Sequence, residues 1–197
     1  MELEEIRKIA SKNGGFVKTG QLSELGVDYR GIQKLLKEKE LLKIKNGLYK
    51  IPGFDLTDEE IIEKLFPDGV LCLQSAMLYH GYTIVPPLSW NIAVDKDTSK
   101  SRFKMEYPFV KPYFTEKDQL MVGAEKVSVG KARLYVYNKE RMICDFLKFE
   151  NKLDRTVYNQ AIRRYIEDTD KNPERLYEYA QIRRIYKKAK DVLGVWI

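Results

Sequence analysis

The sequence predicts an α+β fold with helices near the start, a mixed α/β middle and a cluster of helices at the end. Three observations support this prediction. Apolar residues recur at helical spacing near both ends of the chain. A basic segment holds Asn46-Gly47 between two apolar runs, which signals a hairpin. The middle is rich in Pro, Gly, Tyr and Val and contains short alternating runs, as sheets do.

The first 53 residues read as one unit. Its expected elements are, in order, a helix ending at Asn13-Gly14, the short helix GQLSEL behind Thr19, the helix YRGIQKLLKEKE behind Asp28, and strands at residues 41–44 and 48–51. Asp28 is a favourable N-cap residue, and Pro52-Gly53 closes the unit. A helix, a helix pair and a two-stranded hairpin are the layout of a winged helix-turn-helix. We therefore expect such a domain at residues 1–53.

In a winged helix, the second helix of the pair buries one face and presents the other to DNA. Ile32, Leu35 and Leu36 supply the apolar face here. The opposite face, the wing and the start of the first helix of the pair carry side chains suited to base edges and phosphates. The expected DNA-binding residues are Lys18, Thr19, Tyr29, Arg30, Gln33, Lys34, Lys37, Lys43 and Lys45. The alternative is that these charges only solvate a surface helix and hairpin.

Residues 54–197 are expected to form a second, mixed α/β domain that ends in a helical cluster. The expected helices lie at 57–66, 72–80, 139–150, 154–167, from Asn172-Pro173 onward and at 182–193, and the expected strands at 90–94, 109–114, 119–122 and 132–137. The charge balance changes near Gly53-Phe54. Cations exceed carboxylates in residues 1–53 and 131–197, whereas carboxylates exceed cations in residues 54–130. This change supports the domain boundary.

The last helices are strongly basic. The final one should bury Ile182, Ile185, Tyr186 and Ala189 and turn its cations outward. We expect a single basic surface formed by Arg163, Arg164, Arg183, Arg184, Lys187 and Lys188. It is interpreted either as a solvated helix face or as a second docking face for a polyanion or an acidic partner.

No pattern in the sequence indicates catalysis. His80 is the only histidine, and no matching nucleophile or ligand spacing surrounds it. Asp95, Asp97 and Glu106 are interpreted as a solvated loop rather than a nuclease cluster. Cys72 and Cys144 lie in apolar surroundings and are expected to be reduced core residues. Because phosphate-binding glycine motifs are also missing, we expect no catalytic residue, no metal and no cofactor.

Charge and hydropathy indicate the partners. The 197 residues carry a formal charge of +6, which favours polyanions. The N-terminal segment MELEEIRKIASK lacks the apolar run of a signal peptide. No stretch approaches the ~20 apolar residues of a membrane span. The sequence therefore predicts a cytoplasmic protein without a membrane partner.

The chain resembles the AbiEi antitoxins of AbiE-type abortive-infection systems, which are type IV toxin–antitoxin systems. The similar segments follow one another over nearly the whole chain. They are GGFVKTGQLSELGVDYRGIQKLLKEKELLKIKNGLYKIPG, LCLQSAMLYHGYT, WNIAV, RLYVYNKERMICDFLKFENKLD, YNQAIRRYI and NPERLYEYAQIRRIYKKAKDVLGVW. Each segment is moderately specific, and their order carries the resemblance.

The resemblance implies an N-terminal DNA-binding domain and a C-terminal antitoxin domain at residues 54–197. If it holds, we expect the basic surface of the last helices to serve the antitoxin activity. It implies repression of the protein's own operon through inverted repeats of double-stranded DNA in the promoter. A chain that is monomeric in solution and binds DNA cooperatively is compatible with it. The implied opponent is a nucleotidyltransferase-like toxin, counteracted without a stable complex. Two other functions stay open: an enzyme acting on nucleic acid through the middle α/β region, and a winged-helix adaptor for proteins.

Overall fold

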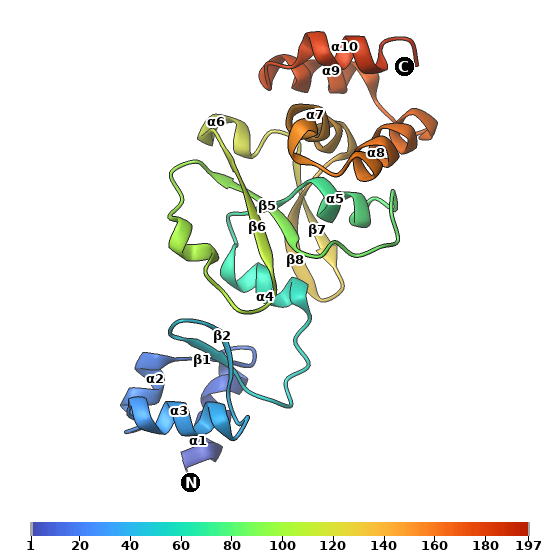
Figure 1. Cartoon of the computed structure of the whole chain (residues 1–197). Coiled ribbons are helices and arrows are strands. Elements are labelled where there is room, and N and C mark those ends of the chain that lie inside the picture. Colours follow the sequence, from blue (N-terminus) through green and yellow to red (C-terminus); the bar gives the residue numbers. More distant parts are fainter. Residues whose placement is uncertain (1, 197) are drawn as a thin grey trace.

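The computed structural model describes residues 2–196, and within that range it confirms a mixed α+β fold with two sheets. The molecule is elongated (Figure 1). The first helices lie at one end, the larger sheet lies in the middle, and the helices that finish the chain lie at the other end. Across the described part of the chain, no helix is both long and apolar enough to cross a membrane.

The N-terminal part combines helices with a small antiparallel sheet. Its elements are α1 Glu2–Lys12, β1 Phe16–Lys18, α2 Thr19–Glu24, α3 Tyr29–Lys37, β2 Leu42–Lys45 and β3 Leu48–Lys50. The strands pair in the order β1-β3-β2. Strand β1 is not predicted from the sequence. It pairs with β3 and forms one edge of the sheet, next to the helices. A separate apolar core holds the part together and includes Ile6, Val17, Leu22, Ile32, Leu35 and Tyr49.

Local signals account for α3 and the hairpin. The Asp28 carboxylate accepts a hydrogen bond from the Gly31 N–H at 2.8 Å, which confirms the expected cap. Gly47 adopts φ +78°, the conformation that the tight turn requires. Helix α3 ends at Lys37, earlier than the sequence predicts, because Lys39 adopts φ +59°. The Glu40 N–H then donates to the Leu35 carbonyl at 2.9 Å, which is the Schellman arrangement.

The middle of the chain forms a mixed sheet with strand order β6-β5-β4-β8-β7. Its elements are α4 Asp58–Leu65, β4 Val70–Leu71, α5 Leu73–Tyr79, β5 Trp90–Asp95, η1 Lys100–Phe103, β6 Val110–Thr115, α6 Lys117–Leu120, β7 Ala124–Val129 and β8 Ala132–Tyr137. The pairs β5·β6 and β4·β8 are parallel, and the pairs β4·β5 and β7·β8 are antiparallel. The strand expected at 119–122 is wrong, since that stretch ends α6 and turns into β7.

The chain finishes in helices gathered at the end of the molecule away from α1–α3 (Figure 1). They are α7 Lys139–Phe149, η2 Glu150–Lys152, α8 Arg155–Glu167, α9 Pro173–Ile182 and α10 Tyr186–Leu193. Asn138, Asp154 and Asn172 cap α7, α8 and α9. Helix α7 is buried along most of its length and holds Cys144, which is a free thiol like Cys72. Both cysteines are core residues, as expected.

A single helix at 182–193 is the second wrong expectation. Helix α9 ends at Ile182, and Arg184 adopts φ +56°. The Arg184 N–H donates to the Gln181 carbonyl at 3.0 Å, and the Ile185 N–H donates to the Ala180 carbonyl at 2.8 Å. This is again a Schellman ending, with an arginine where glycine is usual. Because neither glycine nor proline marks the break, the sequence gives no signal for it.

The N-terminal part is in direct contact with the middle of the chain. Three side chains from its sheet join the larger core: Phe16, Ile44 and Leu48. The Glu106 N–H donates to the Ile44 carbonyl at 2.8 Å, and Lys45 forms an antiparallel bridge with Met105. The edge of β2 is therefore partly covered by the segment that precedes β6. A cut after Gly53, the expected boundary, would uncover these contacts.

Candidate nucleic-acid interface

Helix α3 separates apolar from polar residues sharply. Ile32 and Leu35 are 3% and 8% exposed and pack into the N-terminal core, with Leu36 partly buried against it. The opposite side is exposed and carries Tyr29, Arg30, Gln33, Lys34 and Lys37. The tyrosine side chain is 74% exposed, although it is large and apolar. The helix thus presents one aromatic, one amide and three cations to solvent.

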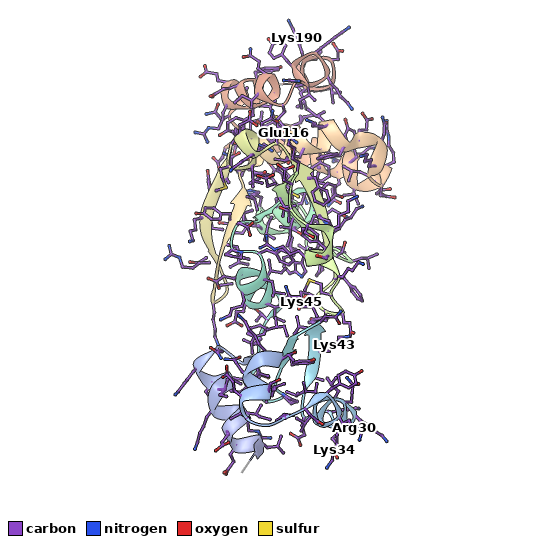
Figure 2. The ribbon with its side chains drawn as sticks, turned by 90° about the vertical axis from the view of Figure 1, so that its left-hand side faces the viewer. Arg30, Lys34, Lys43, Lys45, Glu116 and Lys190 are labelled. Carbon is purple, nitrogen blue, oxygen red and sulfur yellow. The ribbon has the colours of Figure 1, made fainter. Side chains whose placement is uncertain are left out.

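The cations of α3 are little engaged within the chain. Lys34 lies 4.0 Å from the Glu38 carboxylate, an exposed contact of the kind that contributes little to stability. Arg30 and Lys37 form no ion pair with any described side chain. Figure 2 shows Arg30 and Lys34 at one end of the molecule, with Lys190 at the other. The charges of α3 are therefore available to an external anion.

The start of α2 lies against the hairpin turn. The Thr19 N–H donates to the Gly47 carbonyl at 3.1 Å, and the Lys18 N–H donates to the Gln21 side-chain oxygen at 2.9 Å. The Lys18 side chain is exposed, whereas Thr19 is half-buried. The structure thus brings these two expected residues next to the turn between β2 and β3. A cavity of about 310 Å³ opens beside them, and Lys18 and Lys64 are among its lining residues.

The lysines of β2 lie at the junction between the two parts of the chain (Figure 2). Lys43 Nζ lies 2.9 Å from a Glu106 carboxylate oxygen, and this hydrogen bond raises the pKa of the lysine. Lys45 is half-buried, and burial lowers its pKa, as do the nearby charges of Arg102 and Lys18. The sequence signals neither of these neighbours, because Arg102 lies in η1 and Glu106 lies just after it, both far along the chain from β2.

The basic surface expected on the last helices is wrong at Arg183. This side chain is 2% exposed and donates to the Asp145 carboxylate at 2.8 Å. Its other terminal nitrogen donates to Thr115 Oγ1 at 2.9 Å and to Gln119 Oε1 at 3.0 Å. The cause is that Arg183 is the C-cap of α9 and follows the buried Ala180 by three residues and the buried Leu176 by seven, so its side chain continues the buried face of that helix.

Two more of the expected cations form ion pairs with carboxylates. Arg163 pairs with Glu167 at 2.8 Å, and Lys188 pairs with Glu150 at 2.8 Å. The remaining three, Arg164, Arg184 and Lys187, are exposed and form no ion pair with a described side chain. A continuous patch of six outward cations is therefore not present. Three exposed cations without a described ion-pair partner remain, one each on α8, at the end of α9 and on α10, and Arg163 is exposed but paired.

The other titratable groups of the described chain do not assemble into a metal site. Within residues 2–196, no group of three or more His, Cys, Asp and Glu side chains has the geometry to hold a metal ion. Asp95 accepts a hydrogen bond from the Asp97 N–H at 2.9 Å, as in a loop turn. His80 ends α5, as expected, and its Nε2 lies 2.7 Å from the Tyr137 carbonyl. Burial lowers the pKa of this imidazole.

Comparison with known proteins gives a fold and no family. No protein-family model matches the sequence, and no curated protein is significantly similar to it. Among solved structures, the chain is similar to the crystal structure of the RV2827C protein from Mycobacterium tuberculosis. The TM-score is 0.69 at 15% sequence identity, and the match covers 96% of this chain and 74% of the other. At this identity the likeness shows the arrangement of the fold alone.

Proposed function

We propose that this chain is the antitoxin and transcriptional autorepressor of a type IV toxin–antitoxin operon. Residues 1–53 act as a winged helix-turn-helix domain that binds inverted repeats of double-stranded DNA in the operon's promoter. Residues 54–197 act as the antitoxin domain against a nucleotidyltransferase-like toxin. The chain is not an enzyme in this proposal and needs no cofactor.

The outward face of α3 is the single observation that carries the DNA-binding role. A recognition helix needs a buried apolar face and an exposed face of base-reading side chains. Arg30 suits guanine edges and Gln33 suits adenine edges, and both are exposed opposite Ile32 and Leu35. Arg30 forms no ion pair with a described carboxylate, so no such contact has to break when it binds a base. Binding DNA therefore costs this side chain little beyond its own ordering.

Phosphate contacts come from the ends of α2 and α3 and from the hairpin. Lys18, Lys34 and Lys37 are exposed around the recognition face. Cations in these positions neutralise phosphates and release counterions, which supplies much of the affinity of a small domain. Lys43 and Lys45 are in a different position because the second domain engages them. Lys43 must exchange Glu106 for a phosphate before it contributes.

The antitoxin role rests on the resemblance to the AbiEi antitoxins, in which similar segments follow one another in the same order over nearly the whole chain. The elongated shape is compatible with two functions at separate places, since α3 and the last helices lie at opposite ends (Figure 1). Three exposed cations, Arg164, Arg184 and Lys187, are left of the surface that we assign to this role. In this proposal, the toxin gene and the promoter both lie beside the protein's own gene. The repressor role and the antitoxin role can therefore each be tested directly.

A gel shift on the DNA upstream of the protein's own gene tests the repressor half. We expect the full chain to bind this DNA more tightly than a scrambled duplex, with a steep salt dependence. The double variant Arg30→Ala/Gln33→Ala should bind both duplexes with the same weak affinity. Equal binding of both duplexes by the unaltered chain would contradict sequence-specific repression.

Co-expression with the toxin tests the antitoxin half. The Arg30→Ala/Gln33→Ala chain should lose repression of a promoter reporter and still restore growth, because its altered side chains are exposed and belong to α3. Using the full chain avoids uncovering the contacts between Glu106 and Ile44 at the junction. Loss of rescue by a variant that is folded and normally abundant would contradict separate functions.

A further inference from the structure

The connection between α5 and β5 exposes large apolar side chains to an unusual degree. Ile84 is 92% exposed, Val85 is 69% exposed and Leu88 is 99% exposed. The segment Thr83–Leu88 reads TIVPPL and lies beside α8. Single exposed apolar residues are common on protein surfaces, but a cluster of them in one short segment marks an interaction site.

The segment is fixed at its N-terminal end. The Tyr82 hydroxyl donates to the Asp168 carboxylate at 2.7 Å, and the Gln160 amide donates to the Tyr82 carbonyl at 3.0 Å. The Val85 N–H donates to Thr83 Oγ1 at 3.1 Å. Pro86 and Pro87 then restrict the backbone further. The apolar side chains are thus held out toward solvent by the structure around them.

The other end of the segment is tied down as well. The Trp90 indole N–H donates to the Asp58 carboxylate at 2.9 Å, and the Asn91 amide donates to the Ser89 carbonyl at 3.1 Å. Both residues belong to β5, inside the sheet. A partner would therefore meet a preformed surface and would not have to order a loose loop, which favours affinity.

A groove of about 480 Å³ lies between this segment, α5 and α8. Its apolar lining includes Met77, which is buried, and Val157, which is half-buried. Its polar lining includes the amides Gln74 and Gln160. An apolar groove next to projecting apolar side chains suits a peptide segment that contributes apolar side chains of its own.

The charge of the groove defines the chemistry of that peptide. Among the residues that the structure describes, Arg164 is the only charged one that lines the groove, and none of the lining residues is a carboxylate. Among the described side chains Arg164 has no ion-pair partner, whereas the neighbouring Arg163 is paired with Glu167. A single cation at an apolar groove is poorly suited to a phosphate backbone, which requires several. It is suited to one carboxylate beside an apolar anchor.

We infer that the groove between residues 83–88 and α8 is a docking site for a partner protein, which inserts an apolar side chain next to an Asp or Glu. The apolar anchor packs on Val157 and Pro87, and the carboxylate binds Arg164. Ile84 and Leu88 cover the partner's segment from the other side. This site is independent of the proposed DNA-binding face on α3. It shares Arg164 with the proposed antitoxin surface, but its recognition also needs Leu88, which lies outside that surface, so either proposal can fail without the other.

The test begins with a random peptide library displayed on phage and selected on the immobilised full chain. A peptide from the enriched sequences is then synthesised, and its affinity is measured by fluorescence anisotropy. We expect enriched sequences to carry an apolar residue next to Asp or Glu. Leu88→Ser and Arg164→Glu should each weaken binding by about tenfold or more, because each removes one half of the recognition.

Matched controls separate this site from general stickiness or charge. Val195→Ser removes an apolar side chain that is 88% exposed elsewhere, and Lys131→Glu reverses an exposed cation in the turn between β7 and β8. Both should leave the affinity unchanged. Leu88, Arg164, Val195 and Lys131 are all exposed, so the four variants should fold. Thermal unfolding checks this. Ile84→Ser provides a second variant of the projecting segment.

Three results would overturn the proposal. One is a selection that enriches no peptide. Another is a peptide whose affinity is indifferent to Leu88→Ser or to Arg164→Glu. The third is self-association of the unaltered chain in sedimentation that Leu88→Ser abolishes, since the occupant would then be a second copy of the chain.

Discussion

The two basic regions of this protein differ in how their cations are used. On α3, the cations point outward and the nearest carboxylate contact is Lys34 with Glu38 at 4.0 Å. On the last helices, Arg163 and Lys188 form ion pairs with carboxylates, and Arg183 is buried. Both regions are strongly basic in sequence. The comparison teaches that the availability of a cation depends on its partners and on helix endings, which a local charge count does not register.

Replacing Arg183 should have the largest effect on stability. Arg183→Met leaves Thr115 and Gln119 without a donor and leaves Asp145 with Arg141 alone, at 3.4 Å. Removing one partner of a buried ion pair costs about 3–5 kcal/mol, and the lower end applies here because Arg141 remains. Urea unfolding measures the loss.

The matched control for this variant is Lys187→Met, which removes an exposed cation four residues along the chain. Its free energy of unfolding should change by no more than about 0.5 kcal/mol. Equal stability of the two variants would mean that Arg183 is outward, as the sequence alone suggested. A charge reversal that includes Arg183 would place a carboxylate beside the buried Asp145 and destabilise the fold, so it could not test the proposed antitoxin surface.

Replacing Arg30 should have the next largest effect, on DNA binding. If α3 reads DNA as proposed, Arg30→Ala removes its bidentate donor and should cost about 1–3 kcal/mol on the specific site, with relaxed sequence preference. Gel shifts on upstream and scrambled DNA measure both quantities. Lys187→Ala, at the opposite end of the molecule, should change neither. Wild-type affinity and wild-type preference in the Arg30→Ala protein would remove α3 from the interface.

The third prediction concerns the contact between the two parts of the chain. Glu106→Gln frees Lys43, whose pKa the Glu106 hydrogen bond raises, for a phosphate. One added phosphate contact makes the slope of log affinity against log salt steeper by about 0.9. The affinity for specific and scrambled DNA should rise together, about two- to tenfold at low salt.

Two controls test this explanation. Lys43→Ala should cancel the gain when combined with Glu106→Gln, because the freed lysine is its cause. Glu116→Gln removes the same charge from another exposed ion pair, the one with Lys96, and should change little. A gain that survives Lys43→Ala would show a general charge effect and would exclude competition between Glu106 and DNA for this lysine.

The elements that the sequence predicts correctly have local causes. Helix α3 follows from its Asp28 cap and apolar spacing, the hairpin follows from Asn46-Gly47, and α9 follows from Asn172-Pro173. The contact of Lys43 with Glu106 could not be predicted, because 63 positions separate the two residues and only the folded chain brings them together. For the same reason, Arg183 reads as a surface residue until Asp145 is known to face it.

Helix endings without glycine are a second limit of the sequence. Lys39 and Arg184 each occupy the left-handed position of a Schellman ending. In a sequence, lysine and arginine at these positions look like the continuation of a helix. The sequence therefore predicts helix through both positions. Because it also assigns Arg183 to a helix that begins at Ile182 instead of to the end of α9, it predicts an exposed Arg183.

The smallest effect should come from placing glycine at those two positions. A left-handed conformation costs a side-chain-bearing residue about 1–2 kcal/mol, while glycine loses about 0.5–1 kcal/mol through its greater freedom when unfolded. Lys39→Gly and Arg184→Gly should therefore each stabilise the protein by about 0.5 kcal/mol, seen as a higher urea midpoint at unchanged slope.

Lys39→Ala and Arg184→Ala remove the same charges and keep the strain, so they should show no gain. A lower midpoint for Arg184→Gly than for Arg184→Ala would contradict the Schellman ending of α9. With the gain confirmed, Arg184→Gly removes one of the three remaining exposed cations without harming the fold, and growth rescue by Arg184→Gly/Lys187→Gln would then report on the C-terminal surface alone.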